Sequence, residues 1–132
     1  MKKLYIDVDG VLLTSKNTQM AEGSIAFIEE VLSRFDCYWL TTHCKDGNNN
    51  QVLNYLSQYF PINIIEKLKK IKATEWDTLK TEGIDFTSDF YWFDDYVFEI
   101  EKIELRKHDC LNNLILIDLN RPNELFNALQ KL

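Results

Sequence analysis

Four short apolar runs occur along the chain, and each has the length of a β-strand. They cover residues 3–8, 37–40, 90–93 and 114–118. Most residues in these runs are bulky and favour strands. The run at 37–40 is apolar at every position, which is typical of a strand with both faces buried in a parallel sheet.

Apolar residues recur at helical spacing between the first three runs. We expect helices over 22–35 and 51–59, with Pro61 ending the second of them. A further helix is predicted from four apolar residues at helical spacing, namely Ile64, Ile65, Leu68 and Ile71.

The second half of the chain contains shorter helical patterns. They predict a helix over 75–80, a helix or turn over 97–105, and a terminal helix that begins at 120–122. Pro122 fits the first turn of the terminal helix, because the N–H that proline lacks would have no helical partner there. The residues predicted to face inward from this helix are Leu125, Phe126 and Leu129.

Strands thus alternate with helices, which predicts an α/β domain with a mainly parallel central sheet and right-handed crossovers. The length of 132 residues fits a single domain over 1–132. Ligand sites in such sheets lie outside the carboxyl ends of the strands. The polar residues that follow each strand are therefore expected to meet in one site.

The composition excludes several classes of protein. Hydrophobic residues make up 45% and charged residues 27% of the chain, which excludes intrinsic disorder. A net charge of −6 makes nucleic acid an unfavourable partner. No apolar run approaches the ~20 residues of a membrane span, and the start of the chain does not resemble a signal peptide. Three cysteines without paired spacing predict reduced thiols and a cytoplasmic location.

Polar side chains directly follow three of the predicted strands. They form the segments Asp7-Val-Asp9, Thr41-Thr42-His43 and Asp94-Asp95. Four carboxylates in one place repel one another unless a cation lies among them. Oxygen ligands of this kind favour Mg²⁺, which is therefore the predicted cofactor.

The segment Asp7-Val-Asp-Gly-Val-Leu12 resembles the first motif of the haloacid dehalogenase (HAD) superfamily of phosphotransferases. A threonine after the second strand, a lysine, and an acidic pair after a hydrophobic strand resemble the later motifs, in the same order. The resemblance extends from Met1 to about Glu101. It implies a three-layer Rossmann-like fold. It also implies a Mg²⁺-dependent phosphohydrolase that cleaves a phosphate monoester through an aspartyl-phosphate intermediate.

The resemblance implies a role for each matching residue. Asp7 resembles the nucleophile that takes the phosphoryl group and also binds the metal. Asp9 resembles the acid/base residue, and its main-chain carbonyl would bind the metal as well. Thr41 resembles the hydroxyl that hydrogen-bonds the phosphoryl oxygens, with Thr42 as the second candidate.

The lysine and the acidic pair complete the implied site. We favour Lys80, which shortly precedes the strand at 90–93, while Lys72 has the separation from Asp94 that larger relatives show. In similar acidic pairs the second carboxylate contacts the metal and the first supports it, so Asp95 is preferred as ligand over Asp94. Glu99 matches the trailing acid of many relatives or is an exposed helical residue.

The gaps at 10–40 and 42–79 hold only short predicted elements, so neither has room for the cap domain of larger relatives. An open site of this kind resembles relatives that act on bulky phosphorylated substrates or that close the site with a second subunit. His43 and Cys44 lie beside the predicted site. We interpret His43 as a structural residue or a substrate contact, and Cys44 as a buried thiol.

Two other functions are weighed against the hydrolase. A response-regulator receiver domain also uses acids, threonine and lysine on an α/β fold. It places the adjacent acidic pair at the first strand, however, whereas here that pair comes late. The other alternative is a non-catalytic or regulatory protein that binds phosphate or metal on a HAD-like fold. The sequence leaves open the substrate, the oligomeric state, and whether the phosphoryl group passes to water or to another acceptor.

Overall fold

The computed structural model describes residues 1–132 and contains one four-stranded sheet. The strands are β1 (Lys3–Ile6), β2 (Asp36–Trp39), β3 (Phe90–Asp94) and β4 (Leu114–Leu116). Their order is β2-β1-β3-β4, and all neighbouring pairs are parallel. The predicted α/β class and parallel sheet are therefore confirmed, with a last strand shorter than expected.

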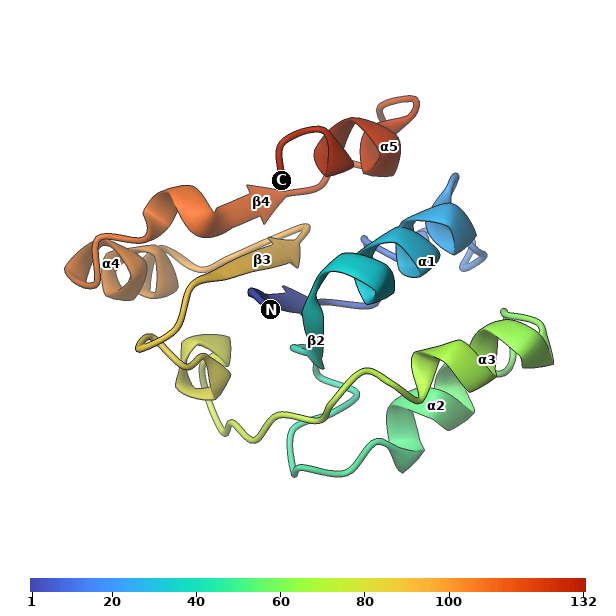
Figure 1. Cartoon of the computed structure of the whole chain (residues 1–132), viewed down its shortest axis with the longest axis horizontal. Helices are drawn as coiled ribbons and strands as arrows, with labels where there is room; N and C mark the ends of the chain where they lie inside the picture. Colours follow the sequence, from blue (N-terminus) through green and yellow to red (C-terminus); the bar gives the residue numbers. More distant parts are fainter.

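Five helices connect or follow the strands. They are α1 (Ser24–Arg34), α2 (Asn50–Leu56), α3 (Ile62–Leu68), α4 (Glu99–Lys107) and α5 (Glu124–Leu129). Figure 1 shows the strands across the middle of the molecule, with α5 beyond β4 and the α2–α3 pair beyond β2. The helix or turn predicted over 97–105 is a helix. Ile71, predicted to lie in a helix, is buried in the turn that follows α3.

Side chains from β1 alternate between two hydrophobic clusters. Leu4 and Ile6 belong to a large cluster that includes residues of α1, α2, α3 and α5. Tyr5 belongs to a smaller cluster that includes Leu105 of α4. Because successive side chains of a strand point to opposite faces, the two clusters lie on opposite sides of β1. Burial on both sides explains why the strands are apolar at almost every position.

The aromatic residues of the strands lie in these clusters rather than at the surface. Trp39, Trp92 and Phe93 have no exposed area, and Tyr91 is half-buried. These four residues therefore belong to the core of the domain. No helix of the chain combines the length and the apolar composition needed to cross a membrane.

The helix predicted over 75–80 is wrong, because the chain is irregular there and only a short 3₁₀ turn, η1 (Lys80–Gly83), follows. The Glu82 carboxylate explains this difference. It accepts the backbone N–H groups of Asp77, Thr78 and Leu79 at 3.0, 3.3 and 3.1 Å. These bonds give the three groups partners that compete with a helix, and they fix the loop that leads into Lys80.

The terminal helix begins at Glu124, later than predicted, and the inward position predicted for Phe126 is also wrong. Leu125 and Ala128 are 0% and 2% exposed, whereas Phe126 is 62% exposed. Leu125 and Ala128 are three residues apart and therefore share one face of the helix. Phe126 is one residue further round the helix, so its ring points to solvent.

Candidate active site

Asp7 and Asp94 lie side by side because β1 and β3 are parallel neighbours that end at the same edge of the sheet. The Asp7 N–H donates to the Phe93 carbonyl at 3.0 Å, which continues the pairing of the two strands. Asp7 is 7% exposed and Asp94 is 1% exposed. Asp95 follows at the surface. The topology thus brings together three of the acids that the sequence singled out.

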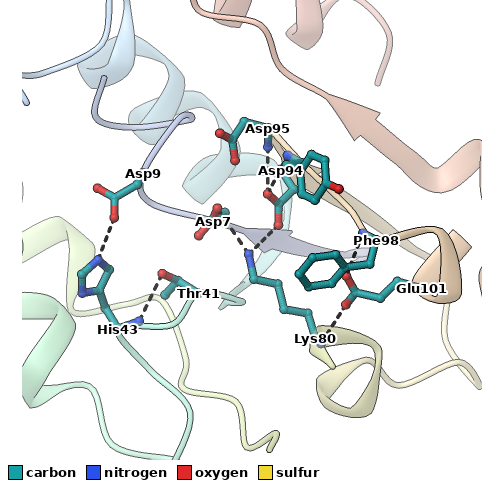
Figure 2. A network of polar contacts seen from close by, with 10 residues as sticks. Asp7, Asp9, Thr41, His43, Lys80, Asp94, Asp95, Phe98 and Glu101 are labelled. Carbon is teal, nitrogen blue, oxygen red and sulfur yellow. Dashed lines mark hydrogen bonds and ion pairs between the residues drawn. The ribbon is translucent and has the colours of Figure 1, made fainter. Parts of the chain in front are cut away.

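Lys80 lies between two of these acids (Figure 2). Its Nζ is 2.7 Å from Asp94 Oδ2 and 3.3 Å from Asp7 Oδ2, and its side chain is only 15% exposed. The other candidate, Lys72, pairs instead with Asp36 at 3.0 Å and is 60% exposed. The structure therefore brings Lys80 to the acidic cluster and places Lys72 elsewhere.

A glutamate that the sequence did not single out holds the backbone of Lys80. Glu101 is buried, and its carboxylate accepts the N–H groups of Lys80 at 2.8 Å and Phe98 at 3.1 Å. Glu99 is 69% exposed and pairs with Arg106. A glutamate three residues after the residue that precedes a helix is a known capping signal. Because Phe98 is not the Ser or Thr with which a capping box begins, this spacing was only a partial signal for Glu101.

Burial makes ionisation of the three clustered carboxyl groups, Asp7, Asp94 and Asp95, unfavourable. Burial raises the pKa of Asp7, although the Lys80 ammonium opposes that rise. Burial and the nearby Asp7 charge raise the pKa of Asp94 to about 6. Partial burial and the bond with Asp94 raise the pKa of Asp95 to about 6. One ammonium thus does not offset three carboxylates, and the cluster favours a further cation.

The donor set fits a hard divalent cation. Asp7, Asp94 and Asp95 each offer a carboxylate oxygen, and the three oxygens lie within 4.8 Å of one another. Carboxylate oxygens are the ligands that Mg²⁺ prefers in proteins. Asp94 also accepts the N–H groups of Asp95 and Tyr96 at 2.8 and 3.2 Å and the Lys80 ammonium. Of the adjacent pair, Asp95 is exposed and Asp94 is buried.

Gly10 permits the close approach of Asp95 to the first motif. Its φ of +84° lies in the left-handed region, and a Cβ at this position would collide with the Asp95 carboxylate. The N–H groups of residues 11–13 all donate to the Val8 carbonyl, which closes the tight turn after β1. Gly10 therefore permits both the left-handed turn and the space that the Asp95 carboxylate occupies.

A Gly10→Ala variant is expected to lose about 1–2 kcal/mol of stability from the positive φ, and any stabilisation by Mg²⁺ that depends on the Asp95 carboxylate should be lost with it. Gly23→Ala is the matched control, since Gly23 has a φ of +75° but nothing within 4 Å of its Cβ position. Urea unfolding measures the first effect in both variants. Mg²⁺-induced thermal shifts measure the second, which Gly23→Ala should retain. Equal Mg²⁺ responses in the two variants would contradict the role assigned to this space.

Asp9 turns away from the three-acid cluster and is bound by two other side chains. Its carboxylate is 2.8 Å from His43 Nε2 and accepts the Tyr55 hydroxyl at 2.9 Å. The two rings stack with their centroids 4.1 Å apart. Burial and the bond to Asp9 raise the pKa of Tyr55 to about 12, so its hydroxyl stays protonated and donates. His43 and Tyr55 thus both bind the Asp9 carboxylate, and no sequence pattern marked Tyr55 for this contact.

Thr41 and Thr42 occupy different environments after β2. Thr41 is fully buried, and its Oγ1 accepts the His43 N–H at 3.3 Å, so its hydroxyl proton remains free to donate. Thr42 is exposed and lines a pocket of about 370 Å³ together with Asp7 and Lys80. Cys44 is 1% exposed, and burial raises the pKa of its thiol. The interpretation of Cys44 as a buried thiol is confirmed.

Comparison with known proteins identifies no relative for this arrangement. The chain matches no family model, no curated protein and no solved structure. The functional interpretation therefore rests on the motifs of the sequence and on the geometry of the site.

Proposed function

We propose that this protein is a Mg²⁺-dependent phosphohydrolase that cleaves a phosphate monoester through an aspartyl phosphate on Asp7. The observation that carries this proposal is the shared Lys80, whose ammonium lies within 3.3 Å of both Asp7 and Asp94. A carboxylate approaches a phosphate dianion only where nearby cations reduce the repulsion between them. The same cluster offers three oxygens to a metal ion.

The metal would be held by Asp7, Asp94 and Asp95, and the HAD resemblance adds the main-chain carbonyl of Asp9. When bound, Mg²⁺ neutralises negative charge on the carboxylates and on the phosphoryl oxygens. Lys80 contributes a second positive charge to the same oxygens, and its position is fixed by Glu101. Thr41 supplies a hydroxyl donor from the end of β2.

The reaction requires one nucleophile and one residue that moves protons. An Asp7 oxygen attacks phosphorus, the bond from phosphorus to the alcohol oxygen breaks, and Asp9 gives that oxygen a proton. Asp9 then takes a proton from a water molecule that attacks the same phosphorus. This breaks the bond to Asp7 and releases inorganic phosphate. His43 and Tyr55 bind both oxygens of the Asp9 carboxylate, which would turn from them toward the phosphoryl group to make the two proton transfers.

We further propose a three-layer arrangement without a cap domain. Residues 7–35 contain one helix, α1, and residues 40–89 contain only α2, α3 and the short turn η1. Helical residues contribute to the hydrophobic clusters on both sides of β1. An open site of this kind would accept a large phosphorylated substrate, or a second copy of the chain would close it.

Phosphate release from 4-nitrophenyl phosphate, with Mg²⁺ or with a chelator, tests the proposed activity. We expect turnover with Mg²⁺ and none with the chelator. Binding of Mg²⁺ without turnover of any phosphate ester would instead favour the non-catalytic alternative.

Mg²⁺ is expected to raise the unfolding temperature more at about pH 7.5 than at about pH 5. Folded-state pKa values near 6 for Asp94 and Asp95 exceed their ordinary values. The metal-free protein therefore loses stability as the pH rises through about 6, and Mg²⁺ binds the deprotonated form. Millimolar Mg²⁺ at the higher pH should add roughly 4 °C. Thermal unfolding with Mg²⁺ and with chelator measures this rise in unfolding temperature. The Asp95→Asn variant should show the same unfolding temperature with Mg²⁺ and with chelator.

A further inference from the structure

The pocket beside Asp7 and Lys80 has aromatic walls. It encloses about 370 Å³ and is lined by three aromatic residues, Trp76, Tyr96 and Phe98. This volume is at the lower end of the range for small-molecule sites, ~300–1,000 Å³. One pocket is thus lined by Asp7 and Lys80, which would contact the phosphoryl group, and by aromatic rings that would contact the rest of the ligand.

Tyr96 and Phe98 are exposed although they are large and apolar. The two residues are 67% and 53% exposed, and their rings meet edge to face with centroids 5.5 Å apart. Burial in the core therefore does not explain them. Two exposed rings beside a polar site are typical of a surface that binds a ligand.

The backbone of these two residues is tied to the catalytic cluster. The Tyr96 N–H donates to Asp94 Oδ1 at 3.2 Å, and the Phe98 N–H donates to Glu101 Oε1 at 3.1 Å. Asp94 contacts Lys80 directly, and Glu101 binds the Lys80 backbone. The same carboxylates thus fix Lys80 and the segment that carries the two rings. These contacts would fix the position of a ligand bound by the two rings relative to the phosphoryl group near Lys80.

Trp76 reaches the pocket from a different segment. Its backbone N–H donates to the Lys45 carbonyl at 3.0 Å, and the Lys45 ammonium lies 4.4 Å from the centre of the indole ring. Lys45 also lines the pocket. A cation on the face of Trp76 adds positive charge to a site that receives an anionic substrate.

We propose that this pocket binds the alcohol part of the substrate, and that this part carries a planar aromatic ring. The ring is that of an aryl group or a nucleobase, both of which present a flat π-face to aromatic side chains. The inference rests on the proposed phosphohydrolase function. It adds to that function a preference for aromatic phosphate monoesters.

The test compares benzyl phosphate with cyclohexylmethyl phosphate, two esters of similar size whose alcohols differ in planarity. Adenosine 5′-monophosphate is the third substrate and represents a nucleobase. The variants are the double substitution Tyr96→Ala/Phe98→Ala and the control Phe126→Ala, which removes a ring that is 62% exposed on α5. The kcat and KM of each protein are measured for each substrate with Mg²⁺, and thermal unfolding checks the fold.

The double variant should lose about 10-fold in kcat/KM, mainly through KM, for at least one of the two aromatic substrates, benzyl phosphate and the nucleotide. Its loss for cyclohexylmethyl phosphate should be much smaller, and Phe126→Ala should behave as wild type. The aromatic substrate with the larger loss identifies the ring as aryl or nucleobase. Equal losses for planar and non-planar esters, or no loss at all, would overturn this inference and leave the proposed function intact. Absence of turnover of every ester by the wild type would overturn both.

Discussion

An Asp7→Asn variant is expected to lose at least about 1,000-fold in kcat, because an amide oxygen cannot form the aspartyl phosphate. The loss should appear in kcat more than in KM, since Asp94, Asp95 and Lys80 remain to attract the phosphate group and its metal. Steady-state release of 4-nitrophenolate from 4-nitrophenyl phosphate measures both parameters.

The same variant is expected to be as stable as the wild type or more stable. Asp7 is 7% exposed, and burial raises the pKa of its carboxyl, so its charge is unfavourable in the fold. Asparagine removes that charge and leaves Lys80 paired with Asp94 at 2.7 Å. Asp36→Asn is the control, in which an ion pair is lost but activity should be kept. It loses the contact with Lys72 at 3.0 Å at the amino end of β2 and should keep full activity. Low activity caused by unfolding of Asp7→Asn would refute this account of Asp7.

A Lys80→Met variant is expected to lose about 3–5 kcal/mol of stability at about pH 7.5, in addition to most of its activity. The side chains of Lys80, Asp7 and Asp94 are 15%, 10% and 1% exposed, so removal of the ammonium leaves two buried carboxylates without their cation. Their pKa values, already raised, would rise further. Because a raised pKa weakens the fold only where the group is ionised, the loss should shrink toward about pH 5.

Urea unfolding in the presence of a chelator measures this loss at the two pH values. Lys72→Met is the matched control, because Lys72 also pairs with an aspartate but is 60% exposed. Exposed ion pairs contribute about 0–1 kcal/mol, so the control should lose little stability and no activity. A similar loss in the two variants would show that Lys80 has no special place in the cluster.

The sequence predicted the parts of the site that depend on strand order. Asp7 and Asp94 follow apolar runs that could be recognised directly, and parallel strands place such residues at one edge of the sheet. Lys80 was preferred over Lys72 for its nearness to β3 in the sequence. The structure gives the physical reason, since Glu82 binds the N–H of Leu79 and Glu101 binds the N–H of Lys80 itself.

Contacts between distant segments could not be predicted in the same way. Tyr55 reaches Asp9 from α2, forty-six positions along the chain, and no local pattern marks that contact. The helix expected over 75–80 failed because the Glu82 side chain accepts three backbone N–H groups. The pocket with Trp76 and Phe98 joins segments whose proximity exists only in the fold.

The most direct test of the central claim is the reaction of an Asp9→Asn variant with 4-nitrophenyl phosphate and Mg²⁺. Nitrophenolate leaves without needing a proton, so the first step should proceed, whereas water attack should stall without the Asp9 base. We expect a burst of one nitrophenolate per protein molecule, and peptide mass spectrometry after an acid quench should find the phosphoryl group on Asp7. Turnover at the wild-type rate, or a phosphoryl group on any other residue, would contradict the proposed mechanism.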